Sequence, residues 1–222
     1  MSELIPPGMT PPPYIVVEGP IGVGKTSLAR KLAMTFNCDT LLEQPEANPF
    51  LTRFYQKPRQ YALQTQLFFL FQRAEQMRSL QQAELFSPVR VSDFLLEKDR
   101  LFAELNLDQD EFALYDNVYR HLTPAAPVPD LVIYLQAPGP VLLQRIQQRG
   151  LAHERSIGAD YLNRLNDAYA RFFHFYDDAP LLIVNATDID PIHRDDDYAQ
   201  LLRRVLDIRS GRHYFNPRPL AG

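Results

Sequence analysis

Residues 14–36 read YIVVEGPIGVGKTSLARKLAMTF, and this stretch decides the fold. The apolar run at 14–17 predicts a buried strand, and the residues that follow Lys25 predict a helix. Between them, residues 19–26 match the pattern G-x-x-x-x-G-K-[ST], whose glycines allow several backbone N–H groups to point into one concavity. A strand, a glycine-rich loop and a helix in this order predict a phosphate-binding loop for a nucleoside triphosphate.

The loop supplies the groups that a bound triphosphate needs. Lys25 is long enough to reach the β- and γ-phosphates, and the start of the helix adds unpaired N–H groups and a positive dipole end. The Thr26 hydroxyl is a candidate ligand for Mg²⁺. We expect the nucleotide to be held by Gly19, Pro20, Ile21, Gly22, Val23, Gly24, Lys25, Thr26 and Ser27.

Composition limits the size of the protein and the kind of partner. A chain of 222 residues suits one α/β domain. Its 23 Lys and Arg against 27 Asp and Glu give a net charge of -4, which favours a small-molecule partner over nucleic acid or membrane. The single cysteine, Cys38, excludes an intrachain disulfide. We find no signal peptide or membrane span, so we expect a soluble, cytoplasmic protein.

Five short apolar strands alternate with helices along the chain, which predicts a doubly wound parallel sheet flanked by helices. The expected strands are 14–17, 40–42, 89–92, 131–135 and 181–184, and the main later helices are 61–82, 109–121, 138–149, 160–176 and 198–208. The prolines in residues 1–13 predict an extended or disordered lead-in. The domain then covers 14–209, and 210–222 form a loose tail.

Two carboxylates follow predicted strands. Glu43 ends the second strand and Asp93 ends the third. Ligands of open α/β sheets bind beyond the carboxyl ends of the strands, so both residues are candidates for chemistry. For Glu43 the alternative is a solvated loop carboxylate, and position alone leaves the two interpretations balanced.

Two pairs of side chains share helix faces. Gln66 and Arg73 are seven residues apart, so both can point into one pocket, although a structural ion pair would also explain an arginine among apolar neighbours. Arg145 and Arg149 are four apart and repel unless an anion or a carboxylate lies between them. A solvated basic face is the alternative. The aromatic stripe at 161–176 indicates core packing or a dimer contact.

The phosphate loop and the segment FYQKPRQYALQTQ at 54–66 together resemble the deoxynucleoside kinase family, and most closely its bacterial deoxyadenosine/deoxyguanosine kinase branch. The resemblance covers nearly all of residues 14–208. It implies a P-loop kinase fold, here with five parallel strands and a helical lid, with ATP and Mg²⁺ as cofactors and a helix-mediated homodimer. It also implies phosphorylation of a deoxynucleoside 5′-hydroxyl in nucleotide salvage.

The resemblance assigns roles to single residues. The segment 54–66 is similar to a family stretch of the form Y-x-K-P-x-x-aromatic, four residues, then Gln. By that match Tyr55 contacts the sugar 3′-hydroxyl, Gln66 reads the base and Arg73 also faces the base. Glu43 takes the position of the catalytic base.

The segment RIQQRGLAHE at 145–154 resembles the arginine-rich lid of the family. Arg145 and Arg149 would then hold the transferred phosphoryl oxygens, and Glu154 would share the 3′-hydroxyl with Tyr55. The lid departs from the family pattern at Leu151, where a third arginine is common. Arg155 is a possible replacement.

A larger departure lies at the third strand, where the family has Asp/Glu-Arg-Ser and this chain has SDF at 92–94. If the chain is aligned with the family pattern without a gap, Asp93 takes the place of the arginine. Lys98 then takes the place of an acid that reads the base. If the alignment allows one deletion in the helix that follows, Asp93 matches the first acid and Asp99 matches the acid that reads the base. Position 94 then stands where the family has the arginine. We prefer the second alignment, because a carboxylate at this strand end can hold Mg²⁺ through water.

The function favoured by these residues is ATP-dependent phosphorylation of a deoxynucleoside, with purines first, deoxycytidine second and thymidine poor. A nucleoside monophosphate kinase of the thymidylate kinase type is the alternative enzyme, with Arg73 on the acceptor phosphate. A non-catalytic nucleotide switch is the third reading, but it gives Glu43, Tyr55 and Gln66 no reason to occur together.

Overall fold

The computed structural model describes residues 5–6, 8–83, 89–123 and 127–216, and the side chains of 80–83 are left out of the description. Six parallel strands form one sheet in the order β2-β3-β1-β4-β5-β6. The strands are β1 Tyr14–Glu18, β2 Asp39–Leu41, β3 Arg90–Ser92, β4 Leu131–Gln136, β5 Leu181–Asn185 and β6 Arg212–Phe215.

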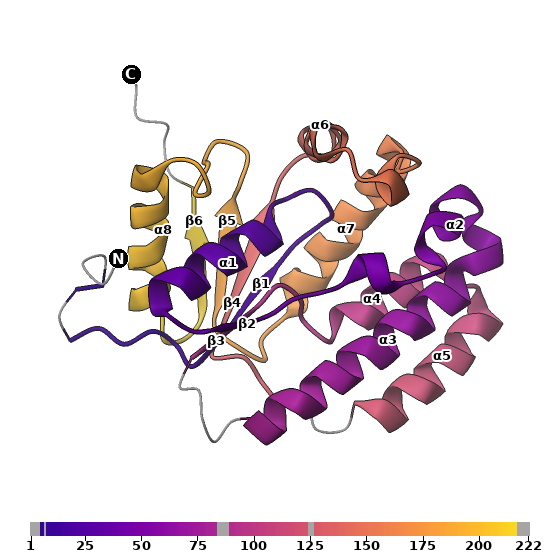
Figure 1. Ribbon diagram of the computed structural model, residues 1–222, viewed down its shortest axis with the longest axis horizontal. Coiled ribbons are helices and arrows are strands. Elements are labelled where there is room, and N and C mark those ends of the chain that lie inside the picture. The colour runs from indigo at the N-terminus through magenta and orange to yellow at the C-terminus, as the bar shows by residue number, and fades with distance from the viewer. Residues whose placement is uncertain (1–4, 7, 84–88, 124–126, 217–222) are drawn as a thin grey trace.

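Helices cover both faces of the sheet, and the helices at 58–83, 98–106 and 109–122 pack on one another as a helical block beside it (Figure 1). The helices are α1 Lys25–Phe36, α2 Leu51–Gln56, α3 Pro58–Ala83, α4 Lys98–Asn106, α5 Gln109–Leu122, α6 Gly139–Arg149, α7 Ala159–Phe175 and α8 Asp195–Asp207. Two short 3-10 helices, η2 Pro45–Ala47 and η3 Ala152–Glu154, complete the described elements. The predicted α/β fold with a parallel sheet flanked by helices is confirmed.

Successive side chains of each strand point to opposite faces of the sheet, so core residues lie on both faces. Ile15 and Val17 pack with α1 and α8, whereas Val16 between them packs with α4 and α7. The strands β1, β4 and β5 are therefore apolar on both sides, as expected for a buried parallel sheet. This packing fixes the carboxyl ends of the central strands against the helical block.

The sheet has six strands rather than the five predicted. The additional strand β6 lies in the segment expected to be a loose tail, so that expectation is wrong for Arg212–Phe215. This edge strand reads RHYF, and only Phe215 is buried. Periodicity did not reveal β6, because a mostly exposed edge strand has no apolar run.

The described part of the lead-in, residues 5–6 and 8–13, forms no helix or strand but contacts the domain. Ile5 packs against the main core, and the amide of Arg90 donates a hydrogen bond to the Pro13 carbonyl at 2.7 Å. Residues 1–4 and 7 lie outside the described residues, as do 217–222 of the tail. No helix in the described part of the chain has the length and apolarity needed to cross a membrane.

Candidate active site

Three neighbouring strands end at one point of the sheet. The phosphate loop follows β1, Asp93 follows β3 directly, and Glu43 lies two residues beyond β2. Because β2, β3 and β1 are adjacent and parallel, these residues gather at the same edge. The sequence therefore predicted this meeting point correctly.

The phosphate loop has the backbone that its glycines allow. Gly19 has a φ of +148°, and a Cβ there would lie 2.4 Å from the carbonyl oxygen of Leu135. Gly24 has a φ of +106° and precedes the first residue of α1. Side chains would strain both positions. The Lys25 ammonium donates a hydrogen bond to the Gly19 carbonyl at 2.8 Å, so it lies across its own loop.

Thr26 and Asp93 make direct contact across the loop, the hydroxyl donating to Oδ2 of the carboxylate. The other oxygen, Oδ1, accepts a hydrogen bond from the backbone N–H of Glu43 at 2.8 Å. Burial and the charge of Glu43 raise the pKa of Asp93, which a bound cation would offset. These oxygen donors fit Mg²⁺. The described residues contain no cluster of three or more His, Cys, Asp or Glu side chains for a metal, so phosphate and water would supply the other ligands.

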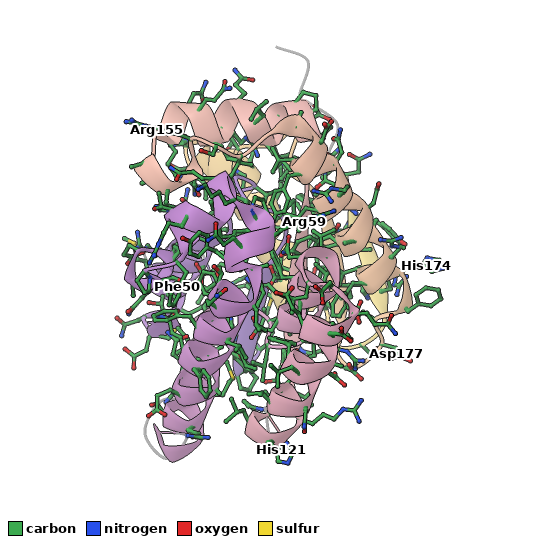
Figure 2. All side chains as sticks on the ribbon, turned by 90° about the vertical axis from the view of Figure 1, so that its right-hand side faces the viewer. Phe50, Arg59, His121, Arg155, His174 and Asp177 are labelled. Carbon is green, nitrogen blue, oxygen red and sulfur yellow. The ribbon has the colours of Figure 1, made fainter. Side chains whose placement is uncertain are left out.

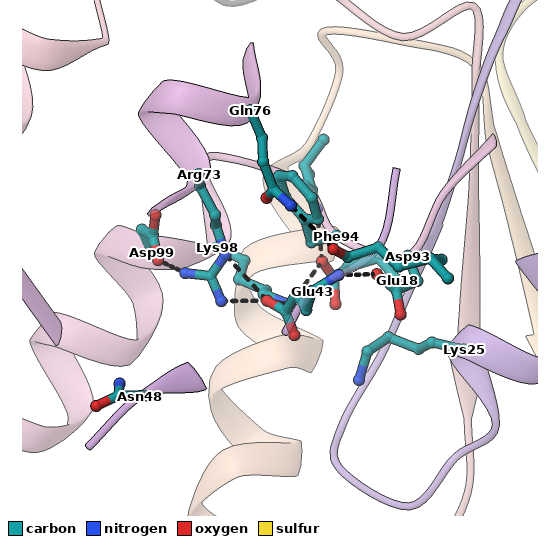
Figure 3. Close-up of polar contacts among 12 residues, drawn as sticks. Glu18, Lys25, Glu43, Asn48, Arg73, Gln76, Asp93, Phe94, Lys98 and Asp99 are labelled. Atoms are coloured by element: carbon teal, nitrogen blue, oxygen red, sulfur yellow. Dashed lines mark hydrogen bonds and ion pairs between the residues drawn. The ribbon is translucent and has the colours of Figure 1, made fainter. Parts of the chain in front are cut away.

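Glu43 lies between two cations (Figure 3). Its Oε1 accepts hydrogen bonds from the Arg73 guanidinium, with Nε at 2.9 Å, and the Lys98 ammonium lies 2.8 Å from the same oxygen. Burial alone raises the pKa of this carboxyl, but the charges of Arg73 and Lys98, with that of Lys25, leave the pKa well below its usual range. The carboxylate is therefore ionised.

Arg73 connects Glu43 to a second carboxylate. Its guanidinium forms an ion pair with Asp99, which is fully buried, and its Cζ lies over the rings of Phe69 and Phe94, 5.0 and 5.7 Å from their centroids. The structure thus brings the predicted Arg73 and Asp99 together. Asp99 lies behind Arg73 and forms no part of the cavity wall. This geometry therefore does not favour direct contact between Asp99 and a base.

One cavity, open at its mouth, lies against this cluster. Phe54, Phe69, Phe102 and Tyr161 add aromatic surface to a polar wall that contains nine of the predicted residues: Lys25, Thr26, Glu43, Tyr55, Gln66, Arg73, Asp93, Arg149 and Glu154. Gln66 is almost fully buried on α3. Burial and the charge of Glu154 are among the causes that raise the pKa of Tyr55. A cavity with aromatic side chains and convergent polar groups suits a small, flat ligand with polar edges.

The two arginines of the predicted lid point to different places. Arg149 forms a paired ion contact with Glu154, with its Nε 3.1 Å from Oε2, and lies on the wall of the cavity. Arg145 instead donates to the carbonyls of Val23 and Ala186 and lines a second cavity on the far side of the phosphate loop. Of these two arginines, only Arg149 lies beside both cavities.

Arg155 does not replace the missing third arginine in this arrangement. Its side chain is exposed and points away from the body of the molecule (Figure 2). Gly150, with a φ of +68°, ends α6 as predicted. Glu154, in η3, is buried against Arg149.

Two buried residues of the site received no role from the sequence. Glu18, at the end of β1, accepts hydrogen bonds from the amides of Gly19 and Leu95 at 2.8 Å and from the Tyr169 hydroxyl at 2.9 Å. Lys98 is 2% exposed. The sequence did indicate that Lys98 is buried, because Lys98 shares a helix face with Leu101 and Phe102, three and four residues later. A charged residue on an apolar face has a buried partner, but the pattern does not name that partner.

A phosphate loop beside an acceptor cavity, with an ionised carboxylate between them, defines a P-loop phosphotransferase. Residues 15–208 match the family described as deoxynucleoside kinase. The chain belongs to the deoxynucleoside kinase family.

Individual relatives agree with this membership. A deoxyguanosine kinase of Bacillus subtilis (strain 168) is 36% identical over 163 residues, covering 72% of this chain and 78% of the relative. A deoxyadenosine kinase of Dictyostelium discoideum is 29% identical, covering 92% of this chain and 83% of the relative. A solved structure of deoxyadenosine kinase from M. mycoides, with 25% identity, superposes with a TM-score of 0.76 over 87% of this chain and 99% of that one.

Proposed function

We propose that the protein transfers the γ-phosphate of ATP to the 5′-hydroxyl of a deoxynucleoside and prefers purines. The observation that carries this proposal is the position of Glu43, which lies on the wall shared by the phosphate loop and the acceptor cavity. Deoxycytidine is the expected second substrate and thymidine a poor one. The relatives named deoxyguanosine and deoxyadenosine kinases support the preference for purines.

The wall formed by Gln66 and Arg73 recognises the base. The Gln66 amide offers both a donor and an acceptor, and the Arg73 guanidinium offers donors only. Asp99 acts behind them, because its ion pair holds the Arg73 fork in place. At the other end of the cavity, Tyr55 and Glu154 bind the 3′-hydroxyl of the sugar.

Transfer proceeds by alignment and charge stabilisation. The 5′-oxygen attacks the γ-phosphorus, its proton passes to Glu43, and the bond between that phosphorus and the bridging oxygen of ADP breaks. The loop N–H groups and Lys25 stabilise the charge on the phosphoryl oxygens. Arg149 adds a cation at the boundary of the two cavities, and Arg145 lies on the donor side.

Thr26 and Asp93 would hold Mg²⁺, Thr26 directly and Asp93 through water. The ion, when bound, neutralises part of the charge on the β- and γ-phosphates. We place the enzyme in the cytoplasm, in nucleotide salvage.

A monophosphate acceptor fits this cavity less well than a nucleoside. A monophosphate kinase needs a cation free to bind the acceptor phosphate, and Arg73 was the candidate. In the structure its guanidinium is occupied by Glu43 and Asp99. Releasing it would leave the buried carboxylate of Asp99 without its counter-ion.

We expect radiolabelled γ-phosphate from ATP to reach deoxynucleosides rather than monophosphates, with kcat/KM for thymidine roughly tenfold or more below the best purine. The same panel should show a loss of roughly tenfold or more for 2′,3′-dideoxynucleosides, because Tyr55 and Glu154 lose a buried partner. The Arg73→Ala variant should lower kcat/KM for every base. Arg78→Ala, on the exposed side of the same helix, is its control. Thymidine as the best substrate, or an Arg73→Ala enzyme with native kcat/KM, would contradict this proposal.

We also propose a homodimer formed through the helical block. The aromatic stripe at 161–176 is not the surface for it, since Tyr169, Phe173 and Tyr176 are buried in the core. Phe71 on α3 and Leu114 on α5 are each 54% exposed, and these two helices pack together.

Sedimentation of the native protein at micromolar concentration should show two chains, and Phe71→Glu should shift the population to monomers, because a charge is costly in an apolar contact. Phe175→Glu, which changes an exposed aromatic residue on α7, is the control and should leave the dimer intact. A native monomer would refute the proposal.

A further inference from the structure

Lys98 is a buried lysine with two carboxylate partners. Its ammonium lies 2.8 Å from Oε1 of Glu43 and 3.5 Å from Oε2 of Glu18, and its side chain is 3% exposed. Burying an ammonium is costly unless charges and hydrogen bonds compensate for the lost water. The two carboxylates provide that compensation, so the position of the ammonium is set by both of them.

Glu18 is fixed much more firmly than Lys98. It is fully buried, and its carboxylate accepts hydrogen bonds from Gly19 of the phosphate loop, from Leu95 before α4 and from Tyr169 of α7. Three donors from three separate segments leave this carboxylate little freedom to move. The ammonium of Lys98 therefore reaches Glu43 from a rigid support.

The contact of Lys98 with Glu43 is made to Oε1. The guanidinium of Arg73 and the ammonium of Lys98 both contact Oε1. Among the described residues, Oε2 takes part in no hydrogen bond or ion pair, and Glu43 and Lys98 both line the acceptor cavity. Oε2 is thus the oxygen available to an acceptor hydroxyl.

No cation comes from the position where the family pattern has an arginine. Position 94 is a phenylalanine, which is fully buried against Met77 and Leu96. The chain places a positive charge beside Glu43 from α4 instead, four residues further along.

We infer that Lys98 is a positioning residue for Glu43: supported by Glu18, its ammonium holds Oε1 so that Oε2 points to the acceptor hydroxyl. Lys98 has no role in substrate affinity under this inference, because it acts on the carboxylate. The inference rests on the proposed role of Glu43 as the base. It predicts an effect on turnover that disappears when Glu43 can no longer accept a proton.

The test is a double-mutant cycle measured by steady-state kinetics. Lys98→Met should lower kcat by about 10- to 100-fold, as loss of alignment of a general base does, with KM for ATP and for the deoxynucleoside changed by less than about threefold. In a Glu43→Gln background, the same substitution should change kcat by less than about threefold, because the two residues act as one unit. Lys98→Arg, which keeps a cation, should recover part of the native kcat.

Lys31→Met is the matched control, since Lys31 pairs with Asp195 outside both cavities. Thermal unfolding of each variant checks the fold, and Lys98→Gln, which removes the charge and shortens the side chain but keeps it polar, takes the place of Lys98→Met if the latter does not fold. The inference would be overturned by any of three results for the Lys98 variant: a full, additive loss of kcat in the Glu43→Gln background, a change confined to KM, or native kinetics. A native chain that transfers no phosphate to deoxynucleosides would refute the proposed function instead.

Discussion

The Lys25→Ala variant is expected to lose ATP-dependent phosphoryl transfer, with kcat/KM for ATP at least about 10³-fold lower. Lys25 is the side-chain cation of the phosphate loop, and its ammonium lies against the carbonyl of Gly19, within the loop that would surround the phosphates. Without it, the loop N–H groups remain, but the charge that develops on the γ-phosphoryl oxygens loses its nearest counter-ion.

The measurement is transfer of labelled γ-phosphate, together with calorimetric titration of the deoxynucleoside in the absence of ATP. Affinity for the deoxynucleoside should stay near the native value. Lys31→Ala, which removes a lysine of the same helix on its outer side, should keep native transfer. A Lys25→Ala enzyme with more than roughly a tenth of native kcat/KM would remove Lys25 from the donor site.

Glu43→Gln should lower kcat by about 10²-fold or more while KM for the deoxynucleoside stays similar. The amide keeps the shape of the side chain but cannot take the 5′-hydroxyl proton. It also removes the negative charge that Arg73 and Lys98 share. Single-turnover kinetics with saturating ATP isolates this effect on the chemical step.

Glu46→Gln provides the matched control, because Glu46 is an exposed carboxylate three residues away in η2. It should leave the rate unchanged. Near-native turnover in a folded Glu43→Gln enzyme would show that another group, or water, accepts the proton.

The parts of the site that sequence predicted well are those fixed by local backbone rules. The glycines of the phosphate loop and the strand ends before Glu43 and Asp93 follow from short-range patterns, and the parallel order of β2, β3 and β1 brings them together. An ion pair of Arg73 was also foreseen, because a buried arginine requires a counter-charge, and the structure provides it in Asp99.

Other features depend on contacts between distant segments. Arg145 and Arg149 share a helix face, but the two side chains diverge because carbonyls of Val23 and Ala186 bind one and Glu154 binds the other. The partners of Lys98 come from β1 and from the loop after β2, which no spacing within α4 reveals. The edge strand β6 escaped prediction because exposure removed its apolar pattern.

The buried carboxylate of Glu18 has a consequence for how the substrates meet. It binds the amide that opens the phosphate loop and the amide that leads into α4, so the donor loop and the helix that carries Lys98 are anchored to the same group. Their relative placement is thus established during folding, before either substrate arrives. The entropy of ordering these segments is lost once, on folding, and not at each catalytic cycle, so the active site is preorganised for transfer.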